Sequence, residues 1–408
     1  MTERRRIVLL AGLALTVRLL ILTAAGGAGG AESYEYGEMA RNLLAGRGYV
    51  YRHLGTDYRA FYGGVPYVLL VAAGYAISPG SALCILLVQA LASVGLTVAA
   101  FAIGRRIGGL TVASVAAALV ALHPGLLYYD THKVHPLGLD ALTIALTVVA
   151  LLRMRETMTG RAAALAGIAF GVALLQRGTM ILVPLAVAGW LAIVGPHGRA
   201  RLGRVGVACA LGTLLVVAPW VGRNWVVLGT PLLASVGPEA LWRGNVPHSA
   251  GGSYALSGRV VLDEAPQIRD ALRGRTELEQ AAIFRAAALS NAAARPLDFL
   301  GRIGRKFLMF WSFGPSSGIL YPPIYLRLYA AYYVAIVILA VIGLGGIGAP
   351  RTWPPETFAS LLLLAAVAVP LSFMQSVFYV ELRHRWEVEA FVLIVTALGL
   401  VRVCGRPS

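Results

Sequence analysis

A few carboxylates stand at the polar ends of apolar stretches, where an acidic side chain could do chemistry. Glu32, Glu35 and Glu38 follow the first long apolar run, and Asp130 and Asp140 flank a later break between two such runs. A carboxylate can take a proton from an attacking hydroxyl or amine, or stabilise positive charge that develops in a transition state. An acid at the edge of a membrane span is costly to bury, which makes it a candidate for function. The alternative for Glu32 is a solvated loop acid or a helix cap, and for Glu35 and Glu38 it is a solvated helix face. For Asp140 the alternative is a cap or a hydrogen bond between helices.

Basic residues at similar positions could meet an anion. Arginine binds a phosphate with two parallel hydrogen bonds, and lysine acts as a point charge. Some of these side chains should contact only lipid headgroups. Arg18 lies inside an apolar run, where it either extends to the interface or pairs with an acid. The candidates for an anion site are Arg59, Arg177, Arg223, Lys306, Arg383 and Arg385.

Three histidines raise the question of a metal. His123, His132 and His135 crowd the break that also holds Asp130, so a divalent ion is conceivable there. Such a loop cluster is more often a polar surface, and we assign no metal ligands. The three cysteines show neither a ligand pattern nor a disulfide framework.

The composition defines the elements that must position these residues. The chain is 58% hydrophobic and only 13% charged, about half the charge of a soluble domain. We therefore predict an all-α integral membrane protein. The net charge of +16 does not indicate nucleic-acid binding, because most arginines stand in short breaks at the ends of apolar segments.

Ten segments are long and apolar enough to cross a membrane as helices. A further run, 65–77, has only 13 residues, which suits a re-entrant or interfacial helix better than a crossing. We read the first run as a retained helix and not as a cleaved signal peptide. The ten segments are 7–24, 83–104, 108–125, 137–152, 162–176, 179–195, 205–221, 324–345, 356–374 and 388–402.

The distribution of arginine predicts the topology. If 65–77 does not cross, the arginines of the N-terminus, of the breaks near 105, 155, 201 and 351, and of the C-terminus all fall on one side. The positive-inside rule then places both termini in the cytoplasm. Two polar stretches, 25–64 and 222–323, lie outside. They hold predicted amphipathic helices at 34–45, 277–294 and 299–313.

Several motifs resemble those of one protein family, both in their order along the chain and in the side of the membrane on which they are predicted to lie. The stretch from Glu32 to Tyr49, with its Leu-Leu-Ala-Gly-Arg-Gly-Tyr ending, is similar to the first outer loop of GT-C superfamily glycosyltransferases. These include family 39 protein mannosyltransferases and the bacterial aminoarabinose and lipopolysaccharide-core transferases. Further agreement comes from Tyr58-Arg59 with Pro66-Tyr67, Gln176-Arg177, 219–225, 241–247 and 295–311. The chain differs in having Glu32 where the family usually has Asp, and in 60–66 and 383–387.

The resemblance implies a GT-C fold in three regions: 1–221 with the first outer loop, 222–323 outside, and 324–408. It implies transfer of a hexosyl or pentosyl group from a polyprenyl-phosphate donor at the outer face of the plasma membrane, the bacterial inner membrane. The acceptor would be a lipid, a polysaccharide or a protein. Glu32 would be the general base, and Asp140, or else Asp130, a second carboxylate. The donor phosphate would be met by Arg59, Arg177, Arg223 and Lys306.

The alternative is a transporter or flippase of a lipid-linked sugar. Transporters gather ionisable or helix-breaking residues near the middle of the membrane, often in two corresponding halves. In this chain the polar residues gather at the outer ends and no repeat is evident, so the pattern favours an enzyme.

Overall fold

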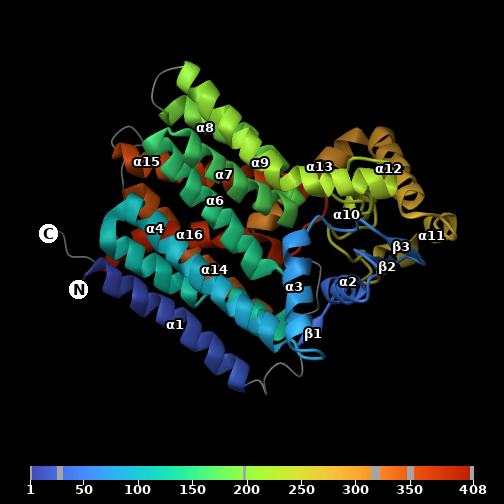
Figure 1. Ribbon diagram of the computed structural model, residues 1–408, viewed down its shortest axis with the longest axis horizontal. Coiled ribbons are helices and arrows are strands. Elements are labelled where there is room, and N and C mark those ends of the chain that lie inside the picture. The colour runs from blue at the N-terminus through green and yellow to red at the C-terminus, as the bar shows by residue number, and fades with distance from the viewer. Residues whose placement is uncertain (1, 25–30, 196–198, 314–321, 347–352, 405–408) are drawn as a thin grey trace.

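The computed structural model describes residues 2–24, 31–195, 199–313, 322–346 and 353–404. A bundle of long helices fills one part of the molecule, and shorter helices with two small strand pairs gather at one end of it (Figure 1). The bundle helices are α1 (Glu3–Ala24), α4 (Leu83–Ala121), α5 (Pro124–His132), α6 (Leu137–Thr157), α7 (Gly160–Gln176), α8 (Val183–Val194), α9 (Arg199–Leu228), α14 (Pro323–Gly346), α15 (Pro355–Val377) and α16 (Arg383–Cys404).

All ten predicted membrane segments are helical, which confirms the predicted all-α membrane fold. Within the described ranges, six helices are long and apolar enough to cross a membrane: α1, α4, α6, α9, α14 and α15. The helices α7 and α8 are shorter, and α16 carries charged side chains in its first two turns. The number of ten crossings therefore stays a prediction, while the helical nature of each segment is confirmed.

Helix α4 contains two of the predicted segments. Its regular geometry breaks at Gly108 and at Gly109, whose φ of +75° favours glycine. The two arms then pack against each other, because a Cβ on Gly104 would lie only 3.1 Å from the Cα of Ala113. Small residues allow such close helix contacts where no hydrophobic effect drives helices together. The 39 residues of α4 thus form a helical hairpin.

Ion pairs join the ends that the arginine pattern assigned to one side. Arg105 at the turn of α4 pairs with Glu3 at the start of α1. Arg155 near the end of α6 pairs with Glu356 at the start of α15, with an N–O distance of 3.0 Å. These ends lie away from the end where the short elements gather (Figure 1). The shared side of these breaks agrees with the predicted topology.

Helix α3 (Val65–Ile77) lies at the other end of the bundle. Near its start, the backbone N–H of Tyr67 donates to Gln176 at the end of α7, over 3.1 Å. Near its finish, a Cβ on Gly74 would lie 2.5 Å from Ile85 in the first turn of α4. Because both ends of α3 meet the same side of the bundle, the segment does not cross it, as its length predicted.

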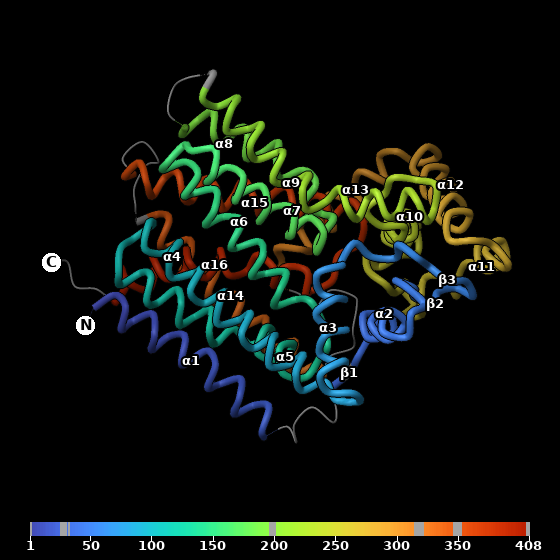
Figure 2. The backbone as a smooth tube through the Cα atoms, viewed as in Figure 1, coloured from blue at the N-terminus to red at the C-terminus, as the bar shows by residue number. Residues whose placement is uncertain are grey.

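Most of the short elements come from the two predicted outer stretches and from the break after α5, and one 3₁₀ helix follows Arg177 between α7 and α8. Figure 2 shows the first stretch, in blue, meeting the yellow and orange α10–α13 at this end. The amphipathic helices appear at the predicted places, as α2, α12 and α13. The elements are β1 (Glu32–Ser33), α2 (Glu35–Leu44), β2 (Tyr51–His53), β3 (Thr56–Tyr58), β4 (Lys133–Val134), the 3₁₀ helix η2 (Gly178–Leu182), α10 (Gly237–Asn245), the 3₁₀ helix η3 (Val261–Glu264), α11 (Pro266–Ala271), α12 (Glu277–Ala294) and α13 (Pro296–Trp311).

Candidate active site

An arginine between two buried carboxylates marks the border between the bundle and the short elements. The Nε of Arg177 lies 3.2 Å from the Oδ2 of Asp140, and its Nη2 pairs with Glu387. Both carboxylates are fully buried, whereas the arginine side chain is 19% exposed. The guanidinium is therefore the accessible part of this carboxylate–arginine cluster, which we define as Asp140, Arg177 and Glu387.

The ends of three helices hold the cluster. Arg177 follows the last residue of α7, and its extended backbone (φ −134°, ψ 95°) turns the side chain away from the helix. Asp140 lies in the first turn of α6, and Glu387 in the second turn of α16. These are the ends that face the short elements, so the charged groups lie where the apolar bundle stops.

Gln176 orients the Asp140 carboxylate. Its Nε2 donates to Asp140 Oδ1 over 3.2 Å, while its Oε1 accepts from the Tyr67 backbone. The hydroxyl of Tyr67 in turn donates to Gln89 on α4, at 2.5 Å. This chain of hydrogen bonds leaves Asp140 with one oxygen for the glutamine and one for the arginine. A carboxylate held in this way is fixed in direction before any ligand arrives.

Aromatic side chains form a wall beside the cluster. The ring of Tyr36 lies edge-on to Tyr67 at 5.1 Å, stacks on Tyr62 at 5.5 Å, and lies 6.1 Å from His135. Burial lowers the pKa of His135 well below its ordinary value, and the positive charges of Arg383, Arg177 and Lys133 lower it further. The imidazole is therefore neutral at pH 7. Its surroundings are electropositive, which suits a phosphate.

The backbone of Glu32 lies next to this wall. Strand β1 pairs in parallel with β4, so that Glu32 is opposite Lys133, two residues before His135. The side chain of Glu32 lies outside the described part of the structure, and its role as general base stays a prediction. The pairing nevertheless brings the first outer stretch to the break between α5 and α6, where the second carboxylate was expected.

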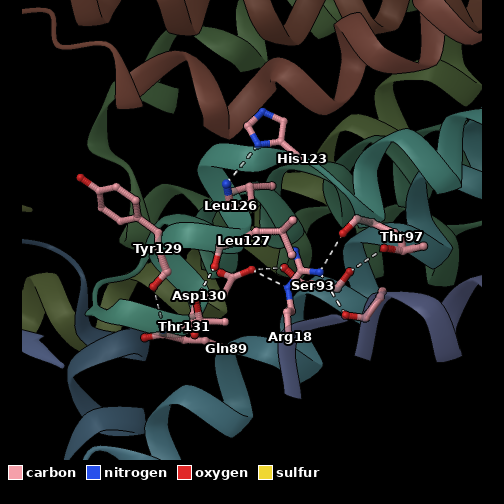
Figure 3. A network of polar contacts seen from close by, with 12 residues as sticks. Arg18, Gln89, Ser93, Thr97, His123, Leu126, Leu127, Tyr129, Asp130 and Thr131 are labelled. Atoms are coloured by element: carbon pink, nitrogen blue, oxygen red, sulfur yellow. Dashed lines mark hydrogen bonds and ion pairs between the residues drawn. The ribbon is translucent and has the colours of Figure 1, made fainter. Parts of the chain in front are cut away.

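Asp130 lies instead in a buried ion pair (Figure 3). Its Oδ2 is 2.9 Å from the Nε of Arg18 and accepts from Ser93. Arg18 also donates to the carbonyl of Ala121 over 2.9 Å. Asp130 is 1% exposed and Arg18 is fully buried, so the pair ties α1 to α4 and α5. These contacts favour a structural role, and the catalytic assignment of Asp130 stays an untested prediction.

Three of the predicted phosphate ligands do not join the cluster. The side chain of Arg59 is exposed, and its backbone N–H donates to Glu277 over 2.7 Å. Arg223 donates to the Arg59 carbonyl over 2.6 Å. Lys306 is fully buried and donates to Asn245 at 2.9 Å and to the carbonyl of Phe378 at 2.6 Å. Arg223 and Lys306 thus hold other parts of the chain together, and of the four residues the structure brings only Arg177 to Asp140.

The histidines do not converge on a common point. His123 pairs with Glu389 at 3.2 Å, His132 stacks on Tyr128, and His135 faces the aromatic wall. Among the described side chains, no group of three or more histidines, cysteines or acids is close enough to hold a metal ion.

Sequence reasoning did not assign Glu387 to the site. The signal was present, because an acid within an apolar helix is costly and is therefore a functional candidate. Its partner Arg177 is more than 200 residues away, so no local pattern could show the pairing. Tyr36 and Tyr67 stood in the recognised motifs, but nothing in their spacing indicated a shared wall.

An apolar groove with a volume of about 380 Å³ lies between α5, α14 and the start of α16. Trp386, the residue before Glu387, lies in its wall, and Tyr128 in the same wall lies under the Lys133 ammonium at 5.6 Å. The groove thus has an apolar and aromatic wall. Its remaining lining residues are Pro124, Gly125, Tyr325, Leu326, Leu328, Tyr329, Tyr332 and Leu382.

Comparison with known proteins agrees with this architecture. Residues 65–222 match the model of the dolichyl-phosphate-mannose-protein mannosyltransferase family. No curated protein sequence matches the chain. The archaeal oligosaccharyltransferase AglB from Archaeoglobus fulgidus, solved with an inhibitory peptide and a dolichol-phosphate, has a similar fold, with 15% identity and a TM-score of 0.58. That match covers 99% of this chain and 52% of AglB.

Two further structures are similar. The apo form of the Archaeoglobus fulgidus oligosaccharyltransferase matches with 16% identity and a TM-score of 0.59, over 98% of this chain and 50% of that one. ArnT from Cupriavidus metallidurans bound to undecaprenyl phosphate matches with 16% identity and a TM-score of 0.47, over 92% and 78%. The chain spans about half the length of the oligosaccharyltransferase. The likeness to the oligosaccharyltransferase shows that the chain has the GT-C membrane fold that the resemblance predicted, and residues 65–222 match the mannosyltransferase family model.

Proposed function

We propose that the chain transfers a sugar from a polyprenyl phosphate to an acceptor of the cell envelope, at the outer face of the plasma membrane. The observation that carries this proposal is the exposed edge of Arg177 between two buried carboxylates, where the apolar helices α6, α7 and α16 meet the short elements. A guanidinium at such a place suits the phosphate of a lipid, and the groove suits an isoprenoid chain. The AglB structure, which contains a dolichol-phosphate, supports a lipid-borne donor for this fold.

In the proposed reaction an acceptor hydroxyl or amine attacks the anomeric carbon of the donor sugar. The new bond forms as the bond from that carbon to the phosphate oxygen breaks, and the polyprenyl phosphate leaves with the electron pair. Arg177 stabilises the negative charge on the leaving phosphate. A carboxylate accepts the proton of the acceptor, and we assign this role to Glu32.

Asp140 and Glu387 would stabilise the positive charge that develops on the donor sugar. The anomeric carbon gains positive character as the leaving group departs, as in other glycosyl transfers through oxocarbenium-like states. A carboxylate held by Gln176 and Arg177 in a buried site stabilises such charge without reorganisation. The carboxylate–arginine cluster thus offers both signs of charge.

The proposal is tested with purified protein in a membrane mimic. Release of radiolabelled sugar is followed from a panel of polyprenyl-phosphate sugars, with a cell-envelope extract as acceptor. Wild type should turn over, and Glu32→Gln should lose at least about a hundredfold in rate. Arg52→Ala is the matched control, since Arg52 pairs with Asp57 on the surface, where both are more than half exposed.

Other outcomes would change the assignment. Turnover that survives Glu32→Gln moves the base to Glu35 or to Asp140. If no donor is turned over but a donor lipid crosses the membrane of proteoliposomes containing the protein, the flippase function replaces the transferase.

A further inference from the structure

A second network of charged groups lies inside the bundle, close to the groove but apart from the carboxylate–arginine cluster. The Nε of Arg385 donates to Glu389 Oε2 over 3.1 Å, and His123 Nε2 lies 3.2 Å from Glu389 Oε1. All three side chains are at most 1% exposed. Charges so deep in an apolar bundle are costly, which suggests that they serve a purpose beyond filling space.

The hydroxyl of Tyr329 on α14 joins this network. It donates to Glu389 Oε2, and it accepts from Arg385 Nη2 at 3.2 Å and from Trp386 Nε1 at 2.5 Å. One oxygen thus connects three residues of the first two turns of α16. The Nη1 of Arg385 also donates to the carbonyls of Phe310 and Ser312 at the end of α13, over 2.9 and 2.7 Å.

These contacts fix the rotation of α16 about its axis. At about 100° per residue, Arg385 and Glu389 share one face of the helix, and Glu387 points to the opposite face. That opposite face meets Arg177. A helix whose one side is fixed by hydrogen bonds to α14 can present Glu387 to Arg177 in only one direction.

We propose that Tyr329 is a positioning residue, which fixes α16 through Arg385, Trp386 and Glu389 so that Glu387 faces Arg177. The expected effect of Tyr329 on the rate of transfer rests on the proposed function, whereas its expected effect on the orientation of α16 does not. Tyr329 does not touch the carboxylate–arginine cluster through any contact described above. It acts on the cluster through the orientation of α16.

The matched pair of variants is Tyr329→Phe and Tyr333→Phe. The first removes the shared oxygen and keeps the ring. The second removes the hydroxyl of Tyr333, which lies one helical turn after Tyr329. The Tyr333 ring lies 3.5 Å from the Arg385 guanidinium, and phenylalanine retains this contact. A difference between these two variants therefore reports on the Tyr329 oxygen and not on packing.

A chemical measurement tests the structural part without any activity. In a background with Cys84, Cys209 and Cys404 replaced by alanine, Glu387→Cys is introduced and its reaction with N-ethylmaleimide is timed. The side chain of Glu387 is fully buried in the native chain. Tyr329→Phe should change the rate at least about threefold, because a rotated helix presents position 387 differently. Tyr333→Phe should leave it unchanged, and equal rates in both variants would overturn the proposal.

Kinetics test the consequence for transfer. Tyr329→Phe should lower kcat about tenfold with the KM for donor unchanged, since misplacement of a charged group by a fraction of an ångström weakens its action on the transition state. In a Glu387→Gln background the same change should have little further effect. Full additivity of the two losses would contradict action through Glu387. If Tyr329→Phe does not accumulate in membranes, Glu389→Gln, which also breaks the network, takes its place.

The two measurements separate the two proposals. If wild type turns over but Tyr329→Phe and Tyr333→Phe give equal rates of thiol modification at position 387, only the positioning role of Tyr329 is overturned. Absence of turnover in wild type, with the thiol effect present, overturns the proposed function and leaves the positioning of α16 standing.

Discussion

Two arginine–aspartate pairs, Arg18–Asp130 and Arg177–Asp140, differ in what surrounds them, although their aspartates are only ten residues apart along the chain. Arg18 is fully buried, and its guanidinium is also occupied by the carbonyls of Ala14 and Ala121. Arg177 is 19% exposed and is shared by two carboxylates. Both pairs are buried charges near the ends of apolar helices, so burial alone does not distinguish them. The open edge of the arginine does, because only an open guanidinium can exchange a protein partner for a ligand.

Arg18→Met should have the largest effect on stability. The change leaves the Asp130 carboxylate buried with Ser93 as its remaining partner, and breaking one side of a buried ion pair costs about 3–5 kcal/mol. Unfolding in detergent, followed by temperature or by denaturing surfactant, measures the loss. Transfer per folded molecule should stay within about twofold of wild type, and a selective loss of transfer would assign Asp130 to the chemistry.

Of the single changes in these two pairs, Arg177→Gln should have the largest effect on activity. Removal of one preorganised charge that stabilises the transition state lowers kcat by about a hundredfold or more, equivalent to about 2.7 kcal/mol. The rate of sugar release measures the effect, with Arg52→Ala as the control. A variant that keeps its rate would show that the phosphate is met elsewhere, with Arg59 as the next candidate.

A third ion pair lies outside the bundle, and its contribution to stability should depend on pH. Glu239 on α10 pairs with Arg243 and with His53, at 2.8 Å. Burial acts to raise the pKa of Glu239, but Arg243 and His53 outweigh it, so the pKa lies below its ordinary value. A lowered folded-state pKa gives stability that is present above the unfolded pKa and is lost as pH falls through the folded one.

Glu239→Gln should therefore cost about 2 kcal/mol at pH 7, the scale of hydrogen bonds to charged groups. The difference from wild type should shrink as the pH falls below about 4.5. Melting curves of both proteins between pH 3 and pH 8 measure it. A difference that persists unchanged at the lowest pH would mean that the carboxylate charge is not what stabilises this contact.

The smallest effect is expected when both charges of the first pair are replaced together. Apolar residues of similar size in place of a buried ion pair are often neutral or stabilising, so Arg18→Met with Asp130→Leu should unfold within about 1 kcal/mol of wild type. The corresponding double change, Arg177→Met with Asp140→Leu, should abolish transfer whatever its stability. The contrast between the pairs is sharpened if the Arg18/Asp130 double variant is as stable as wild type while the Arg177/Asp140 double variant has no transfer activity.

The sequence predicted the helices well because the length of an apolar run is a strong local signal. The segment 277–294 is helical over those same residues, and 65–77 does not cross the bundle. The site was harder, because it depends on pairings between distant residues. Nothing local separates Asp130 from Asp140, since both stand near the same break. Their partners, Arg18 and Arg177, come from opposite directions along the chain and are revealed only by the packing.

The connection between α15 and α16 is held through its main chain. Asn245 donates to the carbonyl of Val377 at 2.8 Å, Lys306 to that of Phe378, and the N–H of Val380 donates to Gly251 over 2.9 Å. Every amino acid offers the same carbonyl, so the contacts of Asn245 and Lys306 do not depend on which side chains stand at positions 377 and 378. The turn that leads into Glu387 is thus held from the stretch 222–323, so mutations of Asn245 or Lys306 can change the approach to Glu387 without touching it.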